Sequence, residues 1–321
     1  MNGMNIVALD ALQLMDMDWT DLLAIDPKLV RYDATAPEEV IERAKDADVL
    51  LVNKVRLTRQ VLGSLPRLRY VGVLATGYDN VDCEAARERG IVVTNVPGYS
   101  TDSVAQLVFA LLLELCHQAG HHSDTVKAGR WASQPYYCYW DSPLIELAGK
   151  TMGIFGMGRI GCRTAEIARA FGMKVLACSR TTRQLEGVEW VDFDRLLRES
   201  DVISLSSPLT EQTRGLIDRE ALRRMKKSAF LINTARGGLL VEQDLREALD
   251  AGVIAGAAVD VLSSEPPRAD HPLVGAKNLI VTPHIAWATK EARARLLDTV
   301  RRNISAWMEG RTQNQVNGSR G

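Results

Sequence analysis

Short apolar runs alternate with segments of helical periodicity along most of the chain. The runs are typical of buried strands, and they lie at 5–9, 48–52, 69–74, 91–95, 152–155, 174–178, 201–205, 229–233, 255–260 and 278–282. The helical pattern lies between or after them, at 37–45, 58–64, 83–89, 99–115, 159–171, 220–225, 242–251 and 290–308. Strands that alternate with helices indicate parallel sheets covered by helices on both faces. We therefore expect an α/β protein.

A glycine-rich turn stands between one of these strands and its helix. Gly156, Gly158 and Gly161 have G-x-G-x-x-G spacing and follow the apolar run 152–155. In such a unit the glycines allow a tight turn, close approach of a pyrophosphate and close helix packing, and the helix N-terminus offers free N–H groups to phosphates. We expect a dinucleotide at this turn, whose residues are Gly156, Met157, Gly158, Arg159, Ile160 and Gly161.

The end of the next strand lacks the acid that usually binds the ribose. The chain reads Ser179-Arg180-Thr181-Thr182-Arg183 after the apolar run 174–178. A carboxylate here would repel a 2′-phosphate, whereas hydroxyls and guanidinium groups can bind one. The alternative is a solvated polar loop that still accepts NADH. We favour NAD(P)H with a leaning towards NADPH.

Between the two halves of the pattern lie a long apolar helix, 99–115, and an aromatic stretch, 129–140. The helix is apolar nearly all round and is expected to be buried between two domains. The stretch holds Trp131, Tyr136, Tyr137, Tyr139 and Trp140 with weak periodicity. It is either a packed loop or an arm at an interface, and we favour the arm. The polar tail 310–321 is expected to be frayed.

Composition narrows the class of protein. The 321 residues carry a net charge of −1, with acids and bases interspersed, which argues against nucleic acid or an anionic membrane as partner. No apolar run reaches the ~20 residues of a membrane span, and the N-terminus lacks a secretory pattern. The five cysteines form no C-x-x-C pair, so we expect a cytoplasmic protein without a metal site or a disulfide framework.

Three chemically useful residues follow strands on the same side as the glycine turn: Arg236, Glu265 and His284. Each alone is unremarkable, as a surface cation, a loop acid or a core histidine. Placed together beside a nicotinamide, the three residues could act as one catalytic group. The cation can hold a carboxylate, the histidine can deliver a proton, and the acid can orient the histidine.

Two further strand ends are candidates for anion binding, because ligands of parallel sheets bind at the carboxyl ends of the strands. One is Asn53-Lys54-Val55, and the other is the small-residue loop 75–79. Backbone N–H groups of such a loop can cradle an anion. Taken alone, each is better explained as an ordinary turn.

The motifs together resemble one family. GMGRIG, LINTARGGLLVEQDL, AAVDVLSSEPP and TPHIAW are similar to segments of the D-isomer-specific 2-hydroxyacid dehydrogenases, and LVNK, VGVLATGYDNVD and NVPGYSTDSVA extend the resemblance over essentially the whole chain. Within the family the chain looks closest to glycerate dehydrogenases, also called hydroxypyruvate reductases. The resemblance implies NAD(P)H-dependent, reversible reduction of a small 2-keto acid to the D-2-hydroxy acid.

The resemblance also implies an architecture of two Rossmann-like domains. A flavodoxin-like substrate domain would comprise 1–98 and 287–321, and a Rossmann nucleotide domain 99–286. A homodimer would form through the arm at 115–148.

The same resemblance implies roles for individual residues. It implies Arg236, Glu265 and His284 as the catalytic trio. The implied substrate-binding residues are Asn53, Lys54, Ala75, Thr76 and Gly77. Besides the glycine turn, the cofactor neighbours are expected to be Ser179, Arg180, Thr181, Ser206, Pro208, Thr213, Thr234, Ala235 and Asp260.

A second class of function shares this fold. Corepressors of the family sense dinucleotides rather than catalyse a reaction, so a corepressor-like binding protein is the alternative. The chain has no long flexible tail of the kind those proteins carry, and we therefore expect an enzyme.

Overall fold

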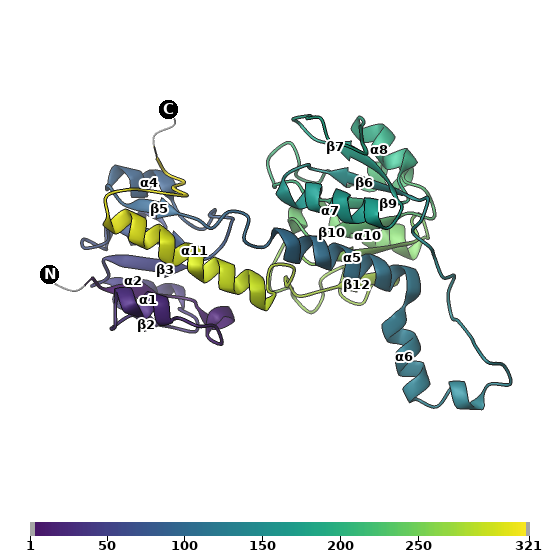
Figure 1. The fold of residues 1–321 in the computed structure, drawn as a ribbon, viewed down its shortest axis with the longest axis horizontal. Helices are drawn as coiled ribbons and strands as arrows, with labels where there is room; N and C mark the ends of the chain where they lie inside the picture. The colour runs from purple at the N-terminus through teal and green to yellow at the C-terminus, as the bar shows by residue number, and fades with distance from the viewer. Residues whose placement is uncertain (1–3, 319–321) are drawn as a thin grey trace. The chain divides into compact units, whose positions relative to one another are not determined.

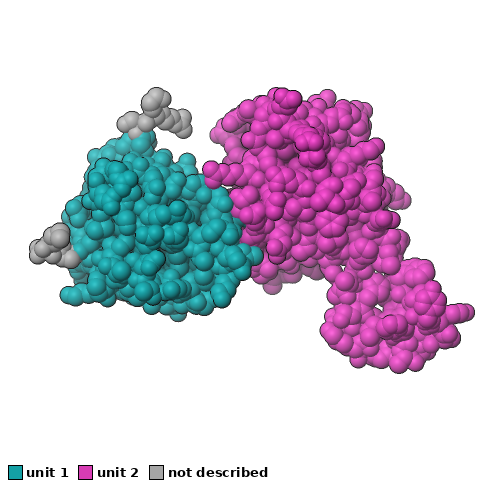
Figure 2. Space-filling view, viewed as in Figure 1, with its two compact units in different colours: residues 1–100, 288–321 teal, residues 101–287 magenta. Residues whose placement is uncertain are grey.

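The computed structural model describes residues 4–318, which form two compact units (Figures 1 and 2). The first unit joins the chain up to Ser100 to the segment from Ala288 onward, and the second runs from Thr101 to Trp287. Each unit is built on one sheet in which every paired strand is parallel. The α/β class with parallel sheets is confirmed.

The sheet of the first unit has the order β2-β1-β3-β4-β5. This is the flavodoxin-like order predicted above. Its strands are β1 (Ile6–Ala8), β2 (Val30–Arg31), β3 (Val49–Val52), β4 (Tyr70–Val73) and β5 (Val92–Thr94). Its helices are α1 (Thr20–Ile25), α2 (Val40–Ala44), α3 (Arg59–Gly63), α4 (Cys83–Glu88) and α11 (Lys290–Met308), with 3₁₀ turns η1 (Leu12–Leu14) and η2 (Pro37–Glu39). The last helix, α11, packs against β4 and α1 (Figure 1).

The sheet of the second unit has the order β12-β11-β10-β9-β6-β7-β8, which is the Rossmann arrangement with one added strand. Its strands are β6 (Thr151–Phe155), β7 (Lys174–Cys178), β8 (Val188–Trp190), β9 (Val202–Leu205), β10 (Phe230–Asn233), β11 (Gly256–Val259) and β12 (Leu279–Val281). Its helices are α5 (Thr101–His117), α6 (Ala119–Lys127), α7 (Arg159–Ala170), α8 (Phe193–Glu199), α9 (Arg219–Arg224) and α10 (Glu242–Asp250), with 3₁₀ turns η3 (Trp131–Ser133) and η4 (Gly237–Leu239).

Apolar side chains cover both faces of the second sheet. One face packs against α8, α9 and α10, and the other against α5 and α7. Phe109 of α5 and Phe171, at the end of α7, stack with their ring centroids 5.3 Å apart. Since both faces are buried, the strands are continuous apolar runs, which explains why their sequence pattern was easy to recognise.

The expectation of a frayed C-terminal tail is wrong for the part that the structure describes. Gln315 forms an antiparallel bridge with Thr94 of β5. The Val316 N–H donates to Val93 O at 2.9 Å, and the buried Asn317 side chain accepts from Val93 N at 2.9 Å and donates to Ile91 O at 2.7 Å. The tail satisfies backbone groups on the open edge of β5. Residues 319–321 lie outside the described part of the chain.

Candidate active site

The glycine turn lies at the carboxyl end of β6, where two of its glycines are required by close contacts. Gly156 has φ +99°, and a Cβ there would lie 2.7 Å from the Ser206 carbonyl carbon. A Cβ on Gly161 would lie 2.1 Å from the Gly156 carbonyl oxygen. Side chains at these positions would push the turn away from β9 and from α7. The sequence motif therefore forms the tight turn that a dinucleotide site needs.

The N-terminus of α7 presents free donors at this turn. Its N-cap is Gly158, and no side chain caps the helix. Within residues 4–318, the N–H groups of Arg159, Ile160 and Gly161 donate to no acceptor. Unpaired N–H groups at the positive end of a twelve-residue helix suit a pyrophosphate. The residues present therefore fit a dinucleotide.

The loop after β7 treats its two arginines differently. Arg183 Nη2 donates to Met157 O at 3.1 Å and contacts Cys162 Sγ, so this guanidinium is anchored on the glycine turn. Arg180 is exposed, and its side chain pairs with nothing in the described part of the chain. Ser179 is partly buried and Thr181 is exposed beside it. Two cations thus lie in the segment 179–184, which contains no acid; Glu186, further along the loop, pairs with Arg169.

Most of the remaining predicted cofactor neighbours follow β9, which is next to β6 in the sheet, or β10, the strand beyond it, and Asp260 follows β11. The buried Ser206 hydroxyl has no partner within residues 4–318. Thr213 Oγ1 donates to Pro208 O at 2.9 Å and accepts from Thr210 N at 2.8 Å, so this hydroxyl shapes its own loop.

The loop at the end of β10 contains Thr234, which is buried, and Ala235, which is partly buried. Both follow Asn233, a fully buried residue that the sequence reading passed over. Its side chain accepts from Ala235 N at 3.1 Å and donates to Arg236 O at 2.9 Å. The sequence signal that could have identified Asn233 is its position as a polar residue at the end of an apolar strand.

Glu265 and His284 are in direct contact. His284 Nδ1 lies 2.7 Å from Glu265 Oε2, and both side chains are partly exposed. Glu265 Oε1 accepts from Leu262 N at 3.0 Å, which fixes the carboxylate. The hydrogen on Nδ1 is assigned from this geometry, because a carboxylate can only accept. His284 Nε2 is then the ring nitrogen that this contact leaves available.

The backbone around His284 is held in an uncommon conformation. His284 has φ 55°, in the left-handed region that non-glycine residues seldom adopt. The buried carboxylate of Asp260 accepts from Thr282 Oγ1 at 2.6 Å, Ile285 N at 2.9 Å and Ala286 N at 2.8 Å. The predicted cofactor neighbour Asp260 thus has both oxygens bound to the segment that carries the histidine.

Arg236 lies on the same edge of the sheet, after β10. Its side chain is exposed, and Nη1 donates to Ala235 O at 2.7 Å. Because β10, β11 and β12 are neighbours in the sheet, Arg236, Asp260 and His284 all follow the carboxyl ends of adjacent strands. The second unit therefore gathers the glycine turn and the predicted trio on one edge.

In the first unit, the predicted substrate loops follow the neighbouring strands β3 and β4. In the loop after β4, the N–H groups of Ala75, Thr76 and Gly77 donate to no acceptor among the described residues. The loop is held by other bonds: Thr76 Oγ1 donates to Val96 O at 2.8 Å, and Asn95 Nδ2 donates to Thr76 O at 2.7 Å. Three successive N–H groups are therefore available to an anion, as the sequence predicted.

The loop after β3 also has three successive backbone N–H groups, but these already donate hydrogen bonds within the protein. Asp10, at the end of β1, accepts from Asn53 N at 2.7 Å, from Lys54 N and from Val55 N at 2.9 Å. The N–H groups of Asn53 and Lys54 are therefore unavailable to a ligand, and only their side chains remain. The sequence reading missed Asp10.

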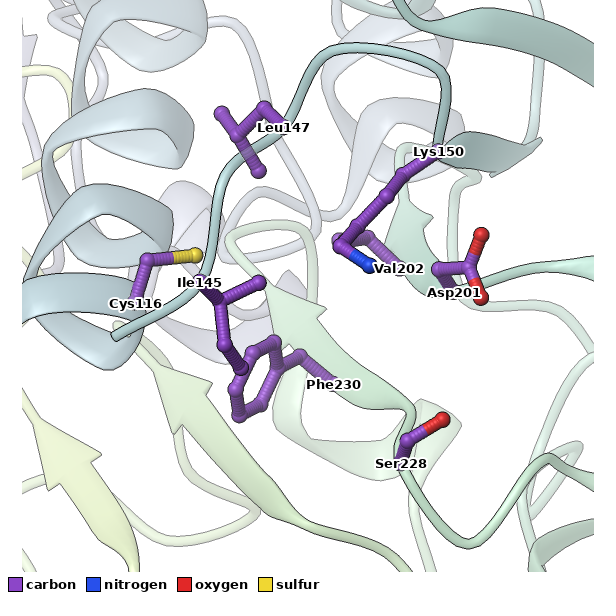
Figure 3. A pocket seen from close by; sticks show the side chains of 8 residues that line it. All are labelled: Cys116, Ile145, Leu147, Lys150, Asp201, Val202, Ser228 and Phe230. Carbon is purple, nitrogen blue, oxygen red and sulfur yellow. The ribbon is translucent and has the colours of Figure 1, made fainter. Parts of the chain in front are cut away.

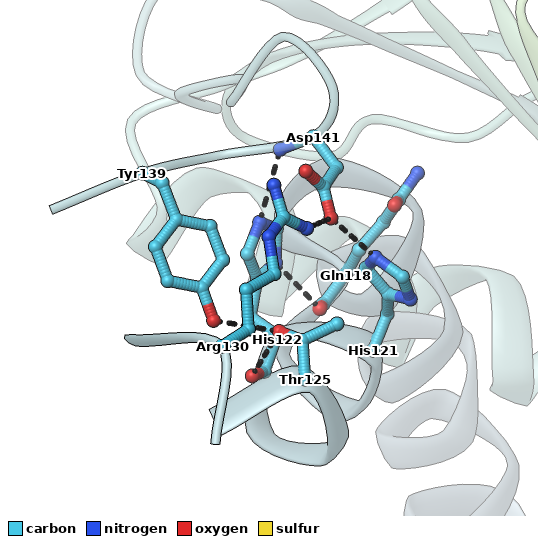
Figure 4. Close-up of polar contacts among 7 residues, drawn as sticks. All are labelled: Gln118, His121, His122, Thr125, Arg130, Tyr139 and Asp141. Atoms are coloured by element: carbon cyan, nitrogen blue, oxygen red, sulfur yellow. Dashed lines mark hydrogen bonds and ion pairs between the residues drawn. The ribbon is translucent and has the colours of Figure 1, made fainter. Parts of the chain in front are cut away.

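The arm between α5 and β6 is held together by polar contacts (Figure 4). Asp141 Oδ2 accepts from Arg130 Nη1 at 2.6 Å and lies 2.7 Å from His121 Nε2. The Arg130 guanidinium also lies 4.4 Å from the centre of the Tyr139 ring, and Tyr139 OH bonds Thr125 Oγ1 at 2.7 Å. The Tyr139 side chain therefore packs within the arm and is not one of its exposed aromatic residues.

The other arm aromatics are exposed. Relative exposure reaches 75 % for Tyr136 and 88 % for Tyr137, and Trp131 and Trp140 are also more than half exposed. Side chains of this size are unusual on open surface in such number. This aromatic surface, made of Trp131, Tyr136, Tyr137 and Trp140, is a candidate contact area.

A small cavity of about 50 Å³ lies at the opposite, amino edge of the second sheet (Figure 3). Phe230, Val202 and Asp201 line it where β9 and β10 begin, and Cys116 and Ile145 close it. It is far too small for a dinucleotide and lies away from the glycine turn. It is therefore no part of the candidate active site.

The described residues contain neither a cluster of metal ligands nor a single helix able to cross a membrane. No group of His, Cys, Asp and Glu side chains among residues 4–318 can hold a metal ion. No single described helix is long and apolar enough to cross a membrane; α5 and α6 pass that test only as a pair bent by 57°. Most of the apolar residues of α5 are buried in the core of the second unit.

Comparison with known proteins gives the same assignment over the whole chain. The family model described as "D-isomer specific 2-hydroxyacid dehydrogenase, NAD binding domain" matches residues 109–286. Hydroxypyruvate reductase of Blautia hydrogenotrophica is 48% identical over 98% of this chain and 100% of its own length. Glycerate dehydrogenase of Methylorubrum extorquens is 42% identical over 89% of this chain and 90% of its own.

A solved structure extends the comparison. The NADPH-dependent glyoxylate/hydroxypyruvate reductase of Sinorhizobium meliloti, in complex with NADP and malonate, matches with a TM-score of 0.83. It is 29% identical, and the match covers 98% of this chain and 97% of that chain.

Proposed function

This chain belongs to the D-isomer specific 2-hydroxyacid dehydrogenase family, as its motifs indicated, and we propose that it reduces hydroxypyruvate or glyoxylate. It is an oxidoreductase of small 2-keto acids with a nicotinamide cofactor. The observation that carries the proposal is the 2.7 Å contact between Glu265 and His284 on the edge that also holds the glycine turn.

The chain's own residues supply acid–base chemistry and charge. A bound nicotinamide supplies the hydride that goes to C2 of the keto acid. His284 Nε2 donates a proton to the carbonyl oxygen as negative charge develops there, while Glu265 holds Nδ1 and stabilises the protonated ring. Arg236 stabilises the developing charge and pairs with the substrate carboxylate. In the reverse direction His284 accepts the proton from the hydroxyl.

Recognition of the substrate carboxylate is assigned to the loop after β4. The free N–H groups of Ala75, Thr76 and Gly77 suit a carboxylate, which can only accept hydrogen bonds. The side chains of Asn53 and Lys54 are proposed to assist from the next loop. The N–H groups of that second loop are excluded from this role by Asp10.

Replacement of His284 tests the reaction. His284→Ala should lower kcat by roughly 10²–10⁴-fold, the usual contribution of a general acid, with cofactor affinity little changed. The measurement is loss of NAD(P)H absorbance with hydroxypyruvate and with glyoxylate, beside cofactor titration by fluorescence. Near-normal kcat in this variant would overturn the assignment. Binding of NAD(P)H without turnover of any keto acid would favour the corepressor-like alternative.

We infer that NADPH is used at least as well as NADH. Arg180 has no partner in the described chain, and Arg183 places a second cation on the glycine turn. A hydrogen bond to a charged group contributes about 1.5–3 kcal/mol, which is roughly ten- to a hundredfold in affinity. Exposure of the loop puts the effect at the lower end, because salt screens it.

A carboxylate at the ribose position tests the preference. Ser179→Asp should reverse it, since aspartate repels a 2′-phosphate and accepts from ribose hydroxyls. The matched control is Ser179→Asn, which has nearly the same shape without the charge. The readout is kcat/KM for both cofactors at low and high salt. A wild-type enzyme that strongly prefers NADH would mean that the polar-loop interpretation is correct.

We further propose a homodimer that buries the aromatic surface of the arm, working in the cytosol. Exposed Tyr136, Tyr137 and Trp140 support the first part, and five unpaired cysteines support the second. Light scattering at micromolar concentration tests the dimer, and a monomer would refute it. A variant with Tyr136 and Tyr137 changed to Ser should shift the mass towards the monomer, whereas Val274→Ser, an exposed apolar residue outside the arm, is the control and should leave the mass unchanged.

A further inference from the structure

The loop that carries Glu265 is bound near its start by a second carboxylate. Glu242, the first residue of α10, accepts from Ser263 N at 2.7 Å through Oε1 and from Ser263 Oγ at 2.5 Å through Oε2. Its side chain is 11% exposed. Hydrogen bonds to an ionised carboxylate are the stronger kind, so Ser263 is held firmly to α10.

A buried histidine fixes Glu242 in turn. His271 Nε2 lies 3.1 Å from Glu242 Oε2, and Nδ1 accepts from Leu273 N at 3.3 Å. With Nδ1 as acceptor, the hydrogen is on Nε2 and points to Glu242. The imidazole is only 8% exposed. Glu242 therefore accepts three hydrogen bonds in one fixed arrangement.

On its other side the same peptide lies against the turn that follows Arg236. A Cβ on Gly237 would lie 2.0 Å from the carbonyl carbon of Leu262 and 2.3 Å from Ser263 N. Only glycine allows this approach. The Leu262–Ser263 peptide is thus enclosed between the residue next to Arg236 and the carboxylate of Glu242.

This peptide leads directly to the acid–base pair. The Leu262 N–H donates to Glu265 Oε1 at 3.0 Å, and Glu265 Oε2 lies 2.7 Å from His284 Nδ1. A shift of the Leu262–Ser263 peptide would also move the adjoining Leu262 N–H, which orients Glu265. We propose that Glu242, supported by His271, is a positioning residue that sets the Glu265–His284 pair and its distance from Arg236.

The inference rests on the proposed function, because it concerns how the catalytic pair is placed. Glu242 touches neither His284 nor Arg236 in the described contacts, so it acts through the loop. A misplacement of about 1 Å can cost about a hundredfold in rate. Loss of Glu242 should therefore lower kcat far more than it changes cofactor affinity.

The test is Glu242→Gln, which keeps the shape but turns one acceptor into a donor facing Ser263 or His271. The expected result is a kcat lower by roughly ten- to a hundredfold, with the Kd for NADPH within about twofold of wild type. The pH–rate profile should move in the same direction as in Glu265→Gln, which a merely structural role would not produce. The control is Glu247→Gln, an exposed residue on the same helix, which should leave kcat unchanged.

A double-mutant cycle separates positioning from a general loss of structure. If Glu242 acts through Glu265, then Glu242→Gln should have little further effect on kcat in a Glu265→Gln background. Multiplicative losses would overturn the inference, as would normal kcat in Glu242→Gln when Glu265→Gln is impaired. Normal kcat in Glu265→Gln itself would overturn the proposed function as well. If Glu242→Gln does not fold, Ser263→Ala replaces it: a several-fold lower kcat supports the inference, and an unchanged kcat overturns it.

Discussion

Two neighbouring loops of the first unit each present three successive backbone N–H groups, but these groups have different hydrogen-bond partners. Both follow parallel strands, β3 and β4, and both present three successive N–H groups. Those of residues 53–55 surround the carboxylate of Asp10. Those of residues 75–77 have no acceptor within the described chain. The first loop is thus an anion cradle filled by the protein's own side chain, and the second is the proposed site for the substrate carboxylate.

The difference supports the proposal that residues 75–77 bind the substrate carboxylate. A filled cradle makes its loop rigid and closes it to ligands. A free cradle leaves three donors that water satisfies until an anion replaces it. The loop at 75–77 keeps its shape without an internal acid because Thr76 and Asn95 make side-chain bonds to backbone carbonyls. A change at Asp10 should therefore alter mainly the stability of the protein, whereas a change at Ala75 should alter mainly substrate binding.

The largest effect is expected from emptying the filled cradle. Asp10→Ala removes the acceptor of three N–H groups, each costing about 1–3 kcal/mol when fully buried and unpaired. Since water can reach part of this loop, the free energy of unfolding should fall by about 2–4 kcal/mol. Urea unfolding measures it. Asp10→Asn, which keeps one acceptor oxygen, should cost less, and an equal loss in both variants would contradict the role of the carboxylate.

A smaller effect is expected from filling the free cradle. Ala75→Asp places a carboxylate beside the three donors, where it competes with the substrate. KM should rise by about ten- to a hundredfold, equivalent to one charge-assisted hydrogen bond, with kcat little changed. Steady-state kinetics at several salt concentrations provide the measurement. Ala75→Asn controls for size; if both variants raise KM equally, the effect is steric and the cradle assignment is wrong.

The smallest effect concerns pH. Burial raises the pKa of Asp10 above its ordinary value of 3.8, and the three N–H groups and Lys54 offset this only in part. For an acid with a raised pKa in the folded state, the stabilising contribution is fully present below the unfolded pKa and is lost as pH rises through the folded pKa. The stability advantage of wild type over Asp10→Asn should therefore shrink as pH rises from about 4 and then level off. A difference independent of pH would contradict the raised pKa.

Local patterns made much of this architecture predictable. The strands are buried on both faces, so their apolar runs stand out, and the glycine turn follows from conformational needs within a few residues. The residues Arg236, Glu265 and His284 were recognisable because each follows a strand on one edge. Short or edge elements were missed: β2 and β8 have two and three residues, too few for a period to be visible.

The residues that organise the loops were not predictable in this way. Asp10 binds Asn53 across 43 positions of sequence, and Glu242 binds His271 across 29. Asn317 binds Val93 across 224 positions, which is why the tail was taken for frayed. Asp10 ends an apolar run, Glu242 begins a helix and Asn317 lies in a polar tail, and in none of the three cases do the neighbouring residues identify the partner.

The sequence by itself determined the α/β class and the place of the dinucleotide turn, because these depend on periodicity and on short-range backbone geometry. Only the tertiary structure decided which N–H groups are already bonded and which are free. Strand order brings distant polar side chains to the same loops, and a buried donor must take whichever acceptor the fold brings within about 3 Å.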